Sequence, residues 1–250
     1  MDEKMAEKYP DGFGKDDIEY AELDNDKVVL LNYTSGTTGF SKGVMLTGNN
    51  LAGNVMYGIE LGVLYRGERE LCFLPLAHAY SCAFNFLVPM AVGAHVYLLG
   101  KVPSPKILLK AFEEVKPNLI LTVPLILEKI YKKMILPQLS KTTMKVALNI
   151  PLLDSRIYAQ IRKKLVDAFG GRFREVIVGG AAMNEEVTNF LYKIKFPFTI
   201  GYGMTECGPL ISYDHNDEYV PGSCGQILKG IMKVRIDSED PYNKVGDCLL

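Results

Sequence analysis

The sequence predicts an α/β fold with a mostly parallel sheet flanked by helices. Short apolar segments typical of strands alternate with helical patterns at about the spacing of β-α-β units. The chain has 250 residues, 48% of them hydrophobic, which is enough for one large domain or two small ones. Past residue 220 the pattern changes to short strands in turn-rich sequence. We therefore expect an α/β core over residues 1–220 and the start of a β-rich subdomain over residues 221–250.

The N-terminal elements surround a loop rich in glycine and hydroxyl groups. Residues 1–26 are polar and predict a loosely structured lead-in. Apolar runs predict strands at 28–32 and 43–46, before and after the loop. Thr47 is a good N-cap for a helix over 49–61.

The remaining elements continue the alternation of strand and helix. Predicted strands lie at 71–74 (ended by Pro75), 95–99, 118–123, 175–178, 198–200, 233–236 and 248–250. Predicted helices lie at 78–92 (ended by Gly93), from Ser104 or Pro105 to 115, from Pro124 onward, from a cap at Asp154 to 169 (ended by Gly170 and Gly171), and from Asn184 onward. Ligands of such sheets bind at the carboxyl ends of the strands, so the loops there are where a site is expected.

Composition narrows the function classes. The net charge of −1 gives no overall field that would attract nucleic acid. Five scattered cysteines, without a CxxC pair, indicate free thiols in a reducing cytosol. The charged N-terminus is unlike a signal peptide, and no apolar run is long enough for a transmembrane helix. The three histidines lie far apart, without the local spacing of a zinc site.

Residues 33–43, YTSGTTGFSKG, form the most informative stretch. Glycines let a backbone approach a ligand closely, and free N–H groups and hydroxyls donate to phosphate oxygens. Lys42 would add a point charge. A polar hairpin loop between two strands explains this stretch equally well when it is considered alone.

Three further stretches follow predicted strands. Residues 74–80 read LPLAHAY, residues 178–182 read VGGAA, and residues 201–209 read GYGMTECGP. Alone, each has an ordinary structural explanation: a helix N-terminus, a tight turn and an irregular connector. However, Tyr202 between two glycines offers a flat ring to a nucleobase. Thr205 and Glu206 offer oxygen ligands that suit a hard cation bridging phosphates.

Together, the four stretches resemble the adenylate-forming superfamily of acyl-CoA synthetases, peptide-synthetase adenylation domains and luciferases. Residues 33–43 look like its phosphate-binding signature, and residues 201–206 look like its GYGxTE signature. Residues 74–80 and 201–213 look most like the long-chain fatty acyl-CoA synthetases. Gly48 departs from the family, which often has an aromatic residue or histidine there, but this position is not expected to act in catalysis.

The resemblance implies ATP and Mg²⁺ as cofactors, CoA as co-substrate and a fatty acid as substrate. It implies catalytic roles for Thr205, Glu206, Lys42 and His78, with Glu206 as the metal ligand. The residues expected to bind the nucleotide are Thr34, Ser35, Gly36, Thr37, Thr38, Gly39, Lys42, Gly179, Gly180, Ala181, Gly201, Tyr202, Gly203 and Thr205.

The resemblance covers nearly the whole chain but only the middle of the family's length. We therefore expect a central fragment of the N-terminal domain, not competent alone, since the ribose-binding aspartate motif and the catalytic lysine domain are expected beyond it. Two alternatives stay open: adenylation of a medium-chain, aryl or amino acid, and a non-catalytic nucleotide-binding module. We expect small-molecule partners, no nucleic acid and a cytoplasmic location. The basic segments 128–133 and 156–164 leave open contact with the inner face of a membrane, although a solvated helix face is the commoner role.

Overall fold

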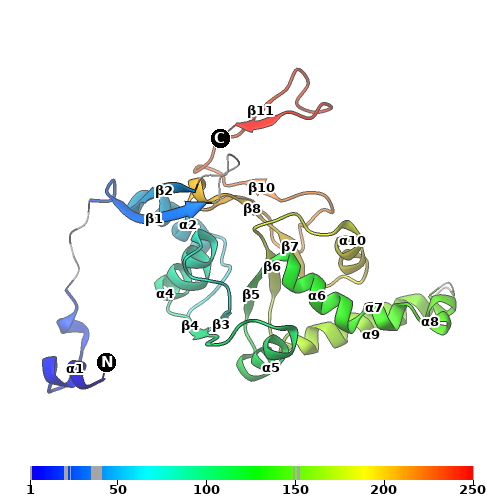
Figure 1. Cartoon of the computed structure of the whole chain (residues 1–250), viewed down its shortest axis with the longest axis horizontal. Coiled ribbons are helices and arrows are strands. Elements are labelled where there is room, and N and C mark those ends of the chain that lie inside the picture. Colours follow the sequence, from blue (N-terminus) through cyan, green and yellow to red (C-terminus); the bar gives the residue numbers. More distant parts are fainter. Residues whose placement is uncertain are drawn as a thin grey trace.

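A five-stranded parallel sheet with helices on both faces organises the chain, as the sequence predicts (Figure 1). The computed structural model describes residues 2–19, 22, 24–34, 41–148, 150 and 153–249. The sheet has the order β4-β3-β5-β6-β7. Its strands are β3 (Arg69–Cys72), β4 (His95–Leu98), β5 (Leu119–Thr122), β6 (Glu175–Val178) and β7 (Phe198–Ile200).

The strand order changes direction between β3 and β5. From β3 the chain adds β4 on one side, and the later strands β5, β6 and β7 extend the sheet on the other side. The loops that leave the carboxyl ends of β3 and β5 therefore diverge, and a crevice opens between the two loops. Open α/β sheets bind ligands at such a switch point.

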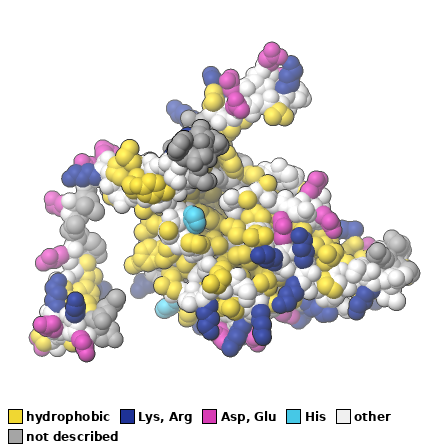
Figure 2. All heavy atoms as spheres, in the orientation of Figure 1, with side chains coloured by type: hydrophobic (Ala, Val, Ile, Leu, Met, Phe, Trp, Pro, Cys, Tyr) yellow, Lys and Arg dark blue, Asp and Glu magenta, His cyan; other side chains and the backbone are white. Residues whose placement is uncertain are grey.

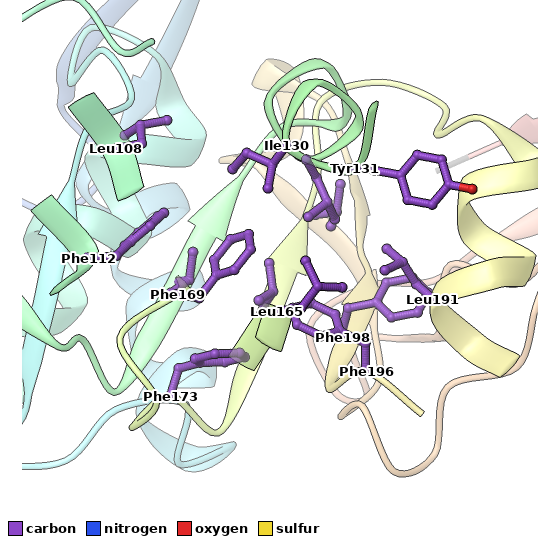
Figure 3. Packing of buried hydrophobic residues seen from close by; sticks show 14 of the residues in the cluster. Leu108, Phe112, Ile130, Tyr131, Leu165, Phe169, Phe173, Leu191, Phe196 and Phe198 are labelled. Carbon is purple, nitrogen blue, oxygen red and sulfur yellow. The ribbon is translucent and has the colours of Figure 1, made fainter. Parts of the chain in front are cut away.

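One face of the sheet carries the larger hydrophobic core. Strand residues such as Ile120 and Val176 pack there against α5 (Pro105–Val115), α9 (Leu153–Ala168) and α10 (Glu185–Lys193). Figure 3 shows aromatic rings filling this layer, with Phe112 and Phe169 stacked at a centroid distance of 5.1 Å. Aromatic side chains bury large apolar areas, so this layer contributes much of the stability.

The opposite face packs against α2 (Gly48–Glu60) and α4 (Val88–Val92). Leu119 and Leu121 of β5 point to this side, whereas Ile120 between them points to the first core. The alternation follows from the period of two along a strand. Because both faces are covered, all four residues of β5 are buried.

The helix termini carry the predicted signals. Thr47, Ser104 and Asn184 cap α2, α5 and α10 through their side chains, and Pro124 begins α6 (Pro124–Met134). Gly170, with a φ of +93°, ends α9. The remaining helices are α1 (Asp2–Lys8), α3 (Ala79–Ser81), α7 (Leu136–Leu139) and α8 (Thr142–Ala147). Figure 1 shows α7, α8 and the adjoining part of α9 projecting from the body as an arm.

The described residues also form three small antiparallel sheets beside the central one. They pair β1 (Val28–Thr34) with β2 (Lys42–Thr47), β9 (Leu210–Tyr213) with both β8 (Tyr202–Gly203) and β10 (Gln226–Ile227), and β11 (Arg235–Asp237) with β12 (Asp247–Leu249). The predicted division at residue 220 stays a prediction.

The structure differs from the sequence prediction in several places. The strand predicted at 71–74 ends at Cys72. The predicted helix 78–92 contains a π-helical segment, Cys82–Leu87, between α3 and α4. Asp154 lies inside the first turn of α9 instead of preceding it, and its carboxylate accepts from the Ser155 N–H at 2.6 Å. The lead-in contains α1 and a 3₁₀ turn at Lys15–Asp17.

Candidate functional site

A cavity of about 920 Å³ opens at the switch point, and all four sequence motifs contribute to its lining. The motif residues that line it are Thr34, Lys42, Leu74, Pro75, His78, Ala79, Tyr80, Val178, Gly179, Gly180, Gly201, Tyr202, Gly203, Met204, Thr205, Glu206 and Pro209. These stretches are far apart in the sequence, and the parallel sheet brings them together because they follow β3, β6 and β7 or end the β1–β2 hairpin. The loops in which a site is expected therefore lie together at one cavity.

The glycine- and hydroxyl-rich loop connects the two strands of the β1–β2 hairpin. Thr34 and Lys42 pair across the end of the ladder, and both line the cavity. Predicted site residues of this loop that lie outside the described residues are Ser35, Gly36, Thr37, Thr38 and Gly39. The open end of the hairpin ladder thus lies at the cavity.

The segment that carries Thr205 and Glu206 is a tight connection between β8 and β9. A 3₁₀ turn, Thr205–Cys207, is closed by the Met204 N–H donating to the Pro209 carbonyl at 2.9 Å. A Cβ atom on Gly203 would lie 2.3 Å from that same carbonyl oxygen, so this position requires glycine. The turn places Thr205 and Glu206 at the cavity wall.

Asn54 of α2 packs behind this segment and bonds to it, and no local sequence pattern indicates this role. Its side chain is 2% exposed, donates to the Cys207 carbonyl at 3.1 Å and accepts from the Leu210 N–H at 2.8 Å. One amide therefore satisfies backbone groups on both sides of Gly208. A contact over this sequence distance can be found only once the fold is known.

Tyr202 separates the cavity from a neighbouring one of about 570 Å³. Gly180, Gly201, Tyr202 and Gly203 line both cavities, whereas Ala181 lines only the second. The Tyr202 side chain is exposed, as a ring that stacks on a planar ligand must be. The structure thus brings Gly180 and Ala181 to the same cavity as Tyr202.

His78 is the residue that precedes α3, where its backbone is extended, and it lines the first cavity. Tyr80, two residues later, donates its hydroxyl proton to the Ile177 carbonyl at 3.2 Å. This bond attaches the cavity wall formed by residues 74–80 to β6. Burial, together with the nearby Glu70 and Glu175 carboxyls, raises the pKa of Tyr80, which keeps it a hydrogen-bond donor.

A buried polar network lies directly beneath this wall. Glu70 is fully buried in β3, and its Oε1 is 2.5 Å from the side-chain amide of Asn85. The other end of that amide is 2.9 Å from Ser81 Oγ, which is 3.2 Å from the Leu74 carbonyl. Burial raises the pKa of the Glu70 carboxyl to about 8. The network connects the middle of the sheet to the cavity lining.

The α6 helix supplies lining residues that sequence reasoning missed. Leu125, Ile126 and Lys129 face the cavity from its first turns. The signal that could have found them is their position, because α6 begins immediately after β5. By sequence alone, Lys129 belongs to the basic segment 128–133.

The donor set at Glu206 fits a divalent cation that is held mainly by phosphates. Among the described residues, no group of three or more histidine, cysteine, aspartate or glutamate side chains could form a metal site by itself. Mg²⁺ is commonly held by one or two carboxylates together with substrate phosphates and water. A single carboxylate beside Thr205 agrees with that arrangement. Within the described part of the chain, no helix has both the length and the apolar character needed to span a membrane.

The parallel sheet and the cavity at its switch point define an α/β protein with a candidate small-molecule site. The model of the AMP-binding enzyme family matches residues 2–247, and the chain belongs to that family. The predicted resemblance to adenylate-forming enzymes is therefore confirmed.

Curated relatives are acid–CoA ligases with different substrates. The chain is 29% identical over 245 residues to long-chain-fatty-acid–CoA ligase 4 of Saccharomyces cerevisiae, covering 90% of this chain and 35% of the relative. It is also 29% identical over 235 residues to 4-coumarate–CoA ligase of Pinus taeda, covering 89% of this chain and 38% of the relative. The chain thus spans between a third and two fifths of these relatives.

Solved structures agree with the fold. O-succinylbenzoate coenzyme A synthetase (MenE) from Bacillus subtilis, in complex with ATP and magnesium ion, superposes with a TM-score of 0.66 at 22% identity, covering 93% of this chain and 43% of that one. ATP-bound MatB from Rhodopseudomonas palustris gives a TM-score of 0.64 at 23% identity, covering 92% and 39%.

Proposed function

We propose that the protein to which this chain belongs is an ATP-dependent acid–CoA ligase that activates a long-chain fatty acid. The observation that carries the proposal is the convergence of the four motifs on one cavity at the switch point of the sheet. The reaction is assigned to the whole protein, since the chain spans about 35% of the yeast ligase that it resembles.

The first step joins two anions. A carboxylate oxygen of the acid forms a bond to the α-phosphorus of ATP, and the bond from that phosphorus to the bridging oxygen of pyrophosphate breaks. The products are acyl-AMP and pyrophosphate. Such a reaction needs positioning and electrostatic stabilisation more than covalent help. In the second step the CoA thiol attacks the acyl carbon, releases AMP and loses its proton.

The phosphates are assigned to the hairpin loop and the 3₁₀ turn. Thr34, Ser35, Gly36, Thr37, Thr38, Gly39 and Lys42 are assigned to the β- and γ-phosphates. Thr205 is assigned to the α-phosphate, and Glu206 to Mg²⁺, which neutralises phosphate charge when it is bound. The positions of Thr34, Lys42, Thr205 and Glu206 on one cavity support these roles.

The adenine is assigned to the second cavity. Tyr202 would stack on the base, with Gly179, Gly180 and Ala181 opposite it and Gly201 and Gly203 leaving room beside the ring. The shared lining of the two cavities supports this arrangement, because a nucleotide can pass from one to the other. His78 is assigned to the carboxylate end of the acid.

A fatty acid is favoured by the apolar part of the first cavity. Phe73, Leu74, Pro103, Leu125 and Ile126 line it, and apolar walls suit an alkyl chain. An amino acid is disfavoured, because Glu206 is the one carboxylate among the described lining residues and is already assigned to the cation. An aryl acid is the second candidate, supported by the 4-coumarate ligases among the relatives.

We further propose a cytoplasmic protein that contacts an anionic membrane surface through α6 and the first residue of α7. Leu125, Lys129, Lys132, Lys133 and Leu136 are all exposed and follow one another at intervals of one, three or four residues. They therefore form one stripe, basic in the middle and apolar at both ends, that starts at the cavity. Apolar groups with flanking lysines suit the interface of an anionic bilayer.

The charge distribution supports this surface. Residues 129–164 contain nine lysines and arginines and one acid, Asp154, giving +8 in a chain whose net charge is −1. The remainder of the chain therefore carries −9. Figure 2 shows Lys and Arg side chains gathered over α6 and along the adjoining edge of the molecule.

Nucleotide binding tests the core of the proposal. Calorimetry with ATP·Mg²⁺ should give binding that Lys42→Ala weakens ten- to a hundredfold, because a charge-assisted hydrogen bond worth about 2 kcal/mol is lost. Lys27→Ala removes the same charge near the opposite end of β1 and should leave affinity unchanged. Equal affinities for all three proteins would contradict the phosphate assignment. No binding by any of them, or by an acyl-AMP analogue, would favour a non-catalytic module.

A test of the substrate class requires the full-length protein. A coupled assay with palmitate, octanoate, 4-coumarate and an amino acid should give the highest kcat/KM for palmitate. A preference for 4-coumarate would establish the aryl alternative instead.

A further inference from the structure

The buried network beneath residues 74–80 contains a contradiction in its hydrogen bonds. If Asn85 Nδ2 faces Glu70 and its Oδ1 faces Ser81, the single Ser81 proton must serve both Asn85 Oδ1 at 2.9 Å and the Leu74 carbonyl at 3.2 Å. The two contacts would then have to share one hydrogen, so at most one of them could be a full-strength hydrogen bond. In addition, a proton on Glu70 Oε2 would be buried without an acceptor.

The reversed Asn85 amide removes both problems. Turning the amide over exchanges its oxygen and nitrogen without moving the other atoms. Glu70 Oε1–H then donates to Asn85 Oδ1, Asn85 Nδ2–H donates to Ser81 Oγ, and Ser81 Oγ–H donates to the Leu74 carbonyl. The 2.5 Å separation at Glu70 is short for N–H···O but ordinary for O–H···O. On Glu70, what remains without a partner is the carbonyl-type oxygen Oε2, which costs less than an unpaired donor or a buried charge at the same position.

We propose that a protonated Glu70 begins this one-way chain of hydrogen bonds, through Asn85 and Ser81, and that the chain positions the cavity wall formed by residues 74–80. Glu70 is a positioning residue, since it touches no ligand. The functional consequence rests on the proposed acyl-adenylate site, because His78 and Tyr80 belong to this wall.

The geometry explains how the wall is held. Its first end is fixed where Ser81 meets the Leu74 carbonyl, and its far end where Tyr80 donates to Ile177. Asn85 lies in the π-helical segment, and such segments occur frequently at functional sites. Ionised Glu70 would lose the donor that orients Asn85, and every hydrogen bond in the series from Glu70 to Leu74 would have to reverse its direction.

The surroundings of Glu70 favour the neutral acid. Burial raises its pKa to about 8. The titratable groups beside it are Cys72 on the same strand and Tyr80 on α3, and burial is the largest cause of the raised pKa of each. Among the described residues, the ion pairs involve other carboxylates, so no cation stabilises an ionised Glu70. We therefore expect the conformation of the wall formed by residues 74–80 to change above pH 8.

The first experiment measures the titration of the Glu70 carboxyl directly. In the chain labelled with ¹³C at the glutamate carboxyls, one resonance should titrate near pH 8 and should be absent from Glu70→Gln. The exposed Glu60→Gln is the matched control and should leave that resonance in place. Titration of every glutamate below pH 6 would overturn the proposal.

The second experiment follows the conformation of the wall by NMR in the absence of a ligand. The backbone amide signals of the non-proline residues 74–81 should shift with the same midpoint in the native chain. They should stay constant in Glu70→Gln, whose side-chain N–H keeps the donor but does not ionise. Ser81→Ala should displace these signals at all pH values while the Glu70 titration persists. If the backbone amide signals of the wall did not shift as Glu70 titrates, the positioning role of Glu70 would be overturned.

The third experiment adds the ligand. An acylsulfamoyl-adenosine, a stable acyl-AMP analogue, should bind the native chain at least tenfold more weakly at pH 9.5 than at pH 6.5. Glu70→Gln should show no such difference, whereas Glu70→Leu should bind weakly at both. Equal loss at pH 9.5 in the native chain and Glu70→Gln would count against the proposal. Absence of binding at either pH would count against the proposed function, and the two resonance experiments would still decide the hydrogen-bond chain.

Discussion

Asn54 is a single buried side chain on which the geometry of the Thr205–Glu206 turn depends. Its amide bonds two backbone groups of that turn, donating to the Cys207 carbonyl and accepting from the Leu210 N–H. Buried backbone groups left without partners cost about 1–3 kcal/mol each. The residue therefore links the stability of α2 to the placement of the candidate phosphate ligands.

Asn54→Ala should lower the free energy of unfolding by about 2–4 kcal/mol, because it leaves both backbone groups unpaired. Its affinity for ATP·Mg²⁺ should fall as well. Val55→Ala on the same helix removes apolar packing but no bond to the turn, so it should destabilise the chain without weakening nucleotide binding. Urea denaturation and calorimetry measure the two effects. Parallel losses of affinity in both variants would show that Asn54 acts only through stability.

Glu70 should also leave a signature in the stability of the chain. The folded state holds a proton that the unfolded chain releases between pH 4.5 and about 8, so stability should fall as pH rises through this window and level off above it. The full shift corresponds to on the order of 5 kcal/mol. Glu70→Gln should remove this slope in urea denaturation, and exposed Glu60→Gln should keep it. Superimposable pH profiles for the native chain and Glu70→Gln would refute the expectation.

At the scale of elements, local signals determined where helices begin and end. Ser104, Asn184 and Pro124 occur at the N-termini that the sequence predicted, because side-chain caps and a fixed proline φ act within one turn. Asp154 failed as a cap, since an acidic residue also suits the interior of the first turn. The π-helical segment escaped prediction because its hydrophobic pattern resembles that of an α-helix.

The end of α9 tests the role of a close backbone contact. A Cβ on Gly170 would lie 2.5 Å from the Phe112 carbonyl oxygen, whereas one on Gly171 would meet nothing nearer than 4.0 Å. Both have positive φ. Gly171→Ala should cost about 1–2 kcal/mol from backbone strain alone, and Gly170→Ala clearly more, because α5 must also move. Chemical denaturation should reveal this difference, and equal costs would refute it.

The exposed stripe on α6 predicts selective membrane binding. Lys132→Glu/Lys133→Glu should reduce sedimentation with phosphatidylcholine–phosphatidylglycerol vesicles at least tenfold, since each lysine near an anionic surface contributes about 1 kcal/mol. Lys229→Glu/Lys233→Glu changes the net charge equally at a distant site and should bind like the native chain. Binding that is equal on pure phosphatidylcholine, or lost equally in both variants, would exclude this surface. Stronger binding to a DNA oligonucleotide than to vesicles would indicate nucleic acid instead.

At the scale of the molecule, the sequence predicted the fold class and the motif positions but not the contacts between them. Strand β6 and helix α5 match their predicted ranges because period and caps are local properties. The meeting of residues 74–80 with 201–209 could be expected from the parallel sheet. Asn54, Asn85 and Lys129 could not, because their roles depend on packing between elements that no local pattern specifies.

Ligand binding should stabilise the whole chain. ATP·Mg²⁺ at a hundred times its dissociation constant would add about 2.7 kcal/mol to the free energy of unfolding, which raises the Tm of a chain of this size by about 5–10 °C. Differential scanning calorimetry measures this rise, and Lys42→Ala should show a smaller one at the same nucleotide concentration. An unchanged Tm at saturating nucleotide would contradict binding to the native state.

The bond between Asn54 and Cys207 joins residues 153 positions apart, and this has a consequence for synthesis. The hairpin and α2 leave the ribosome first, but the turn that completes their cavity follows only after those intervening residues. At about 5–20 residues per second, the early segment waits on the order of ten to thirty seconds for its partner. During that interval the exposed Val29, Leu31 and Met45 of the hairpin are already available to chaperones, while the site itself cannot yet bind anything.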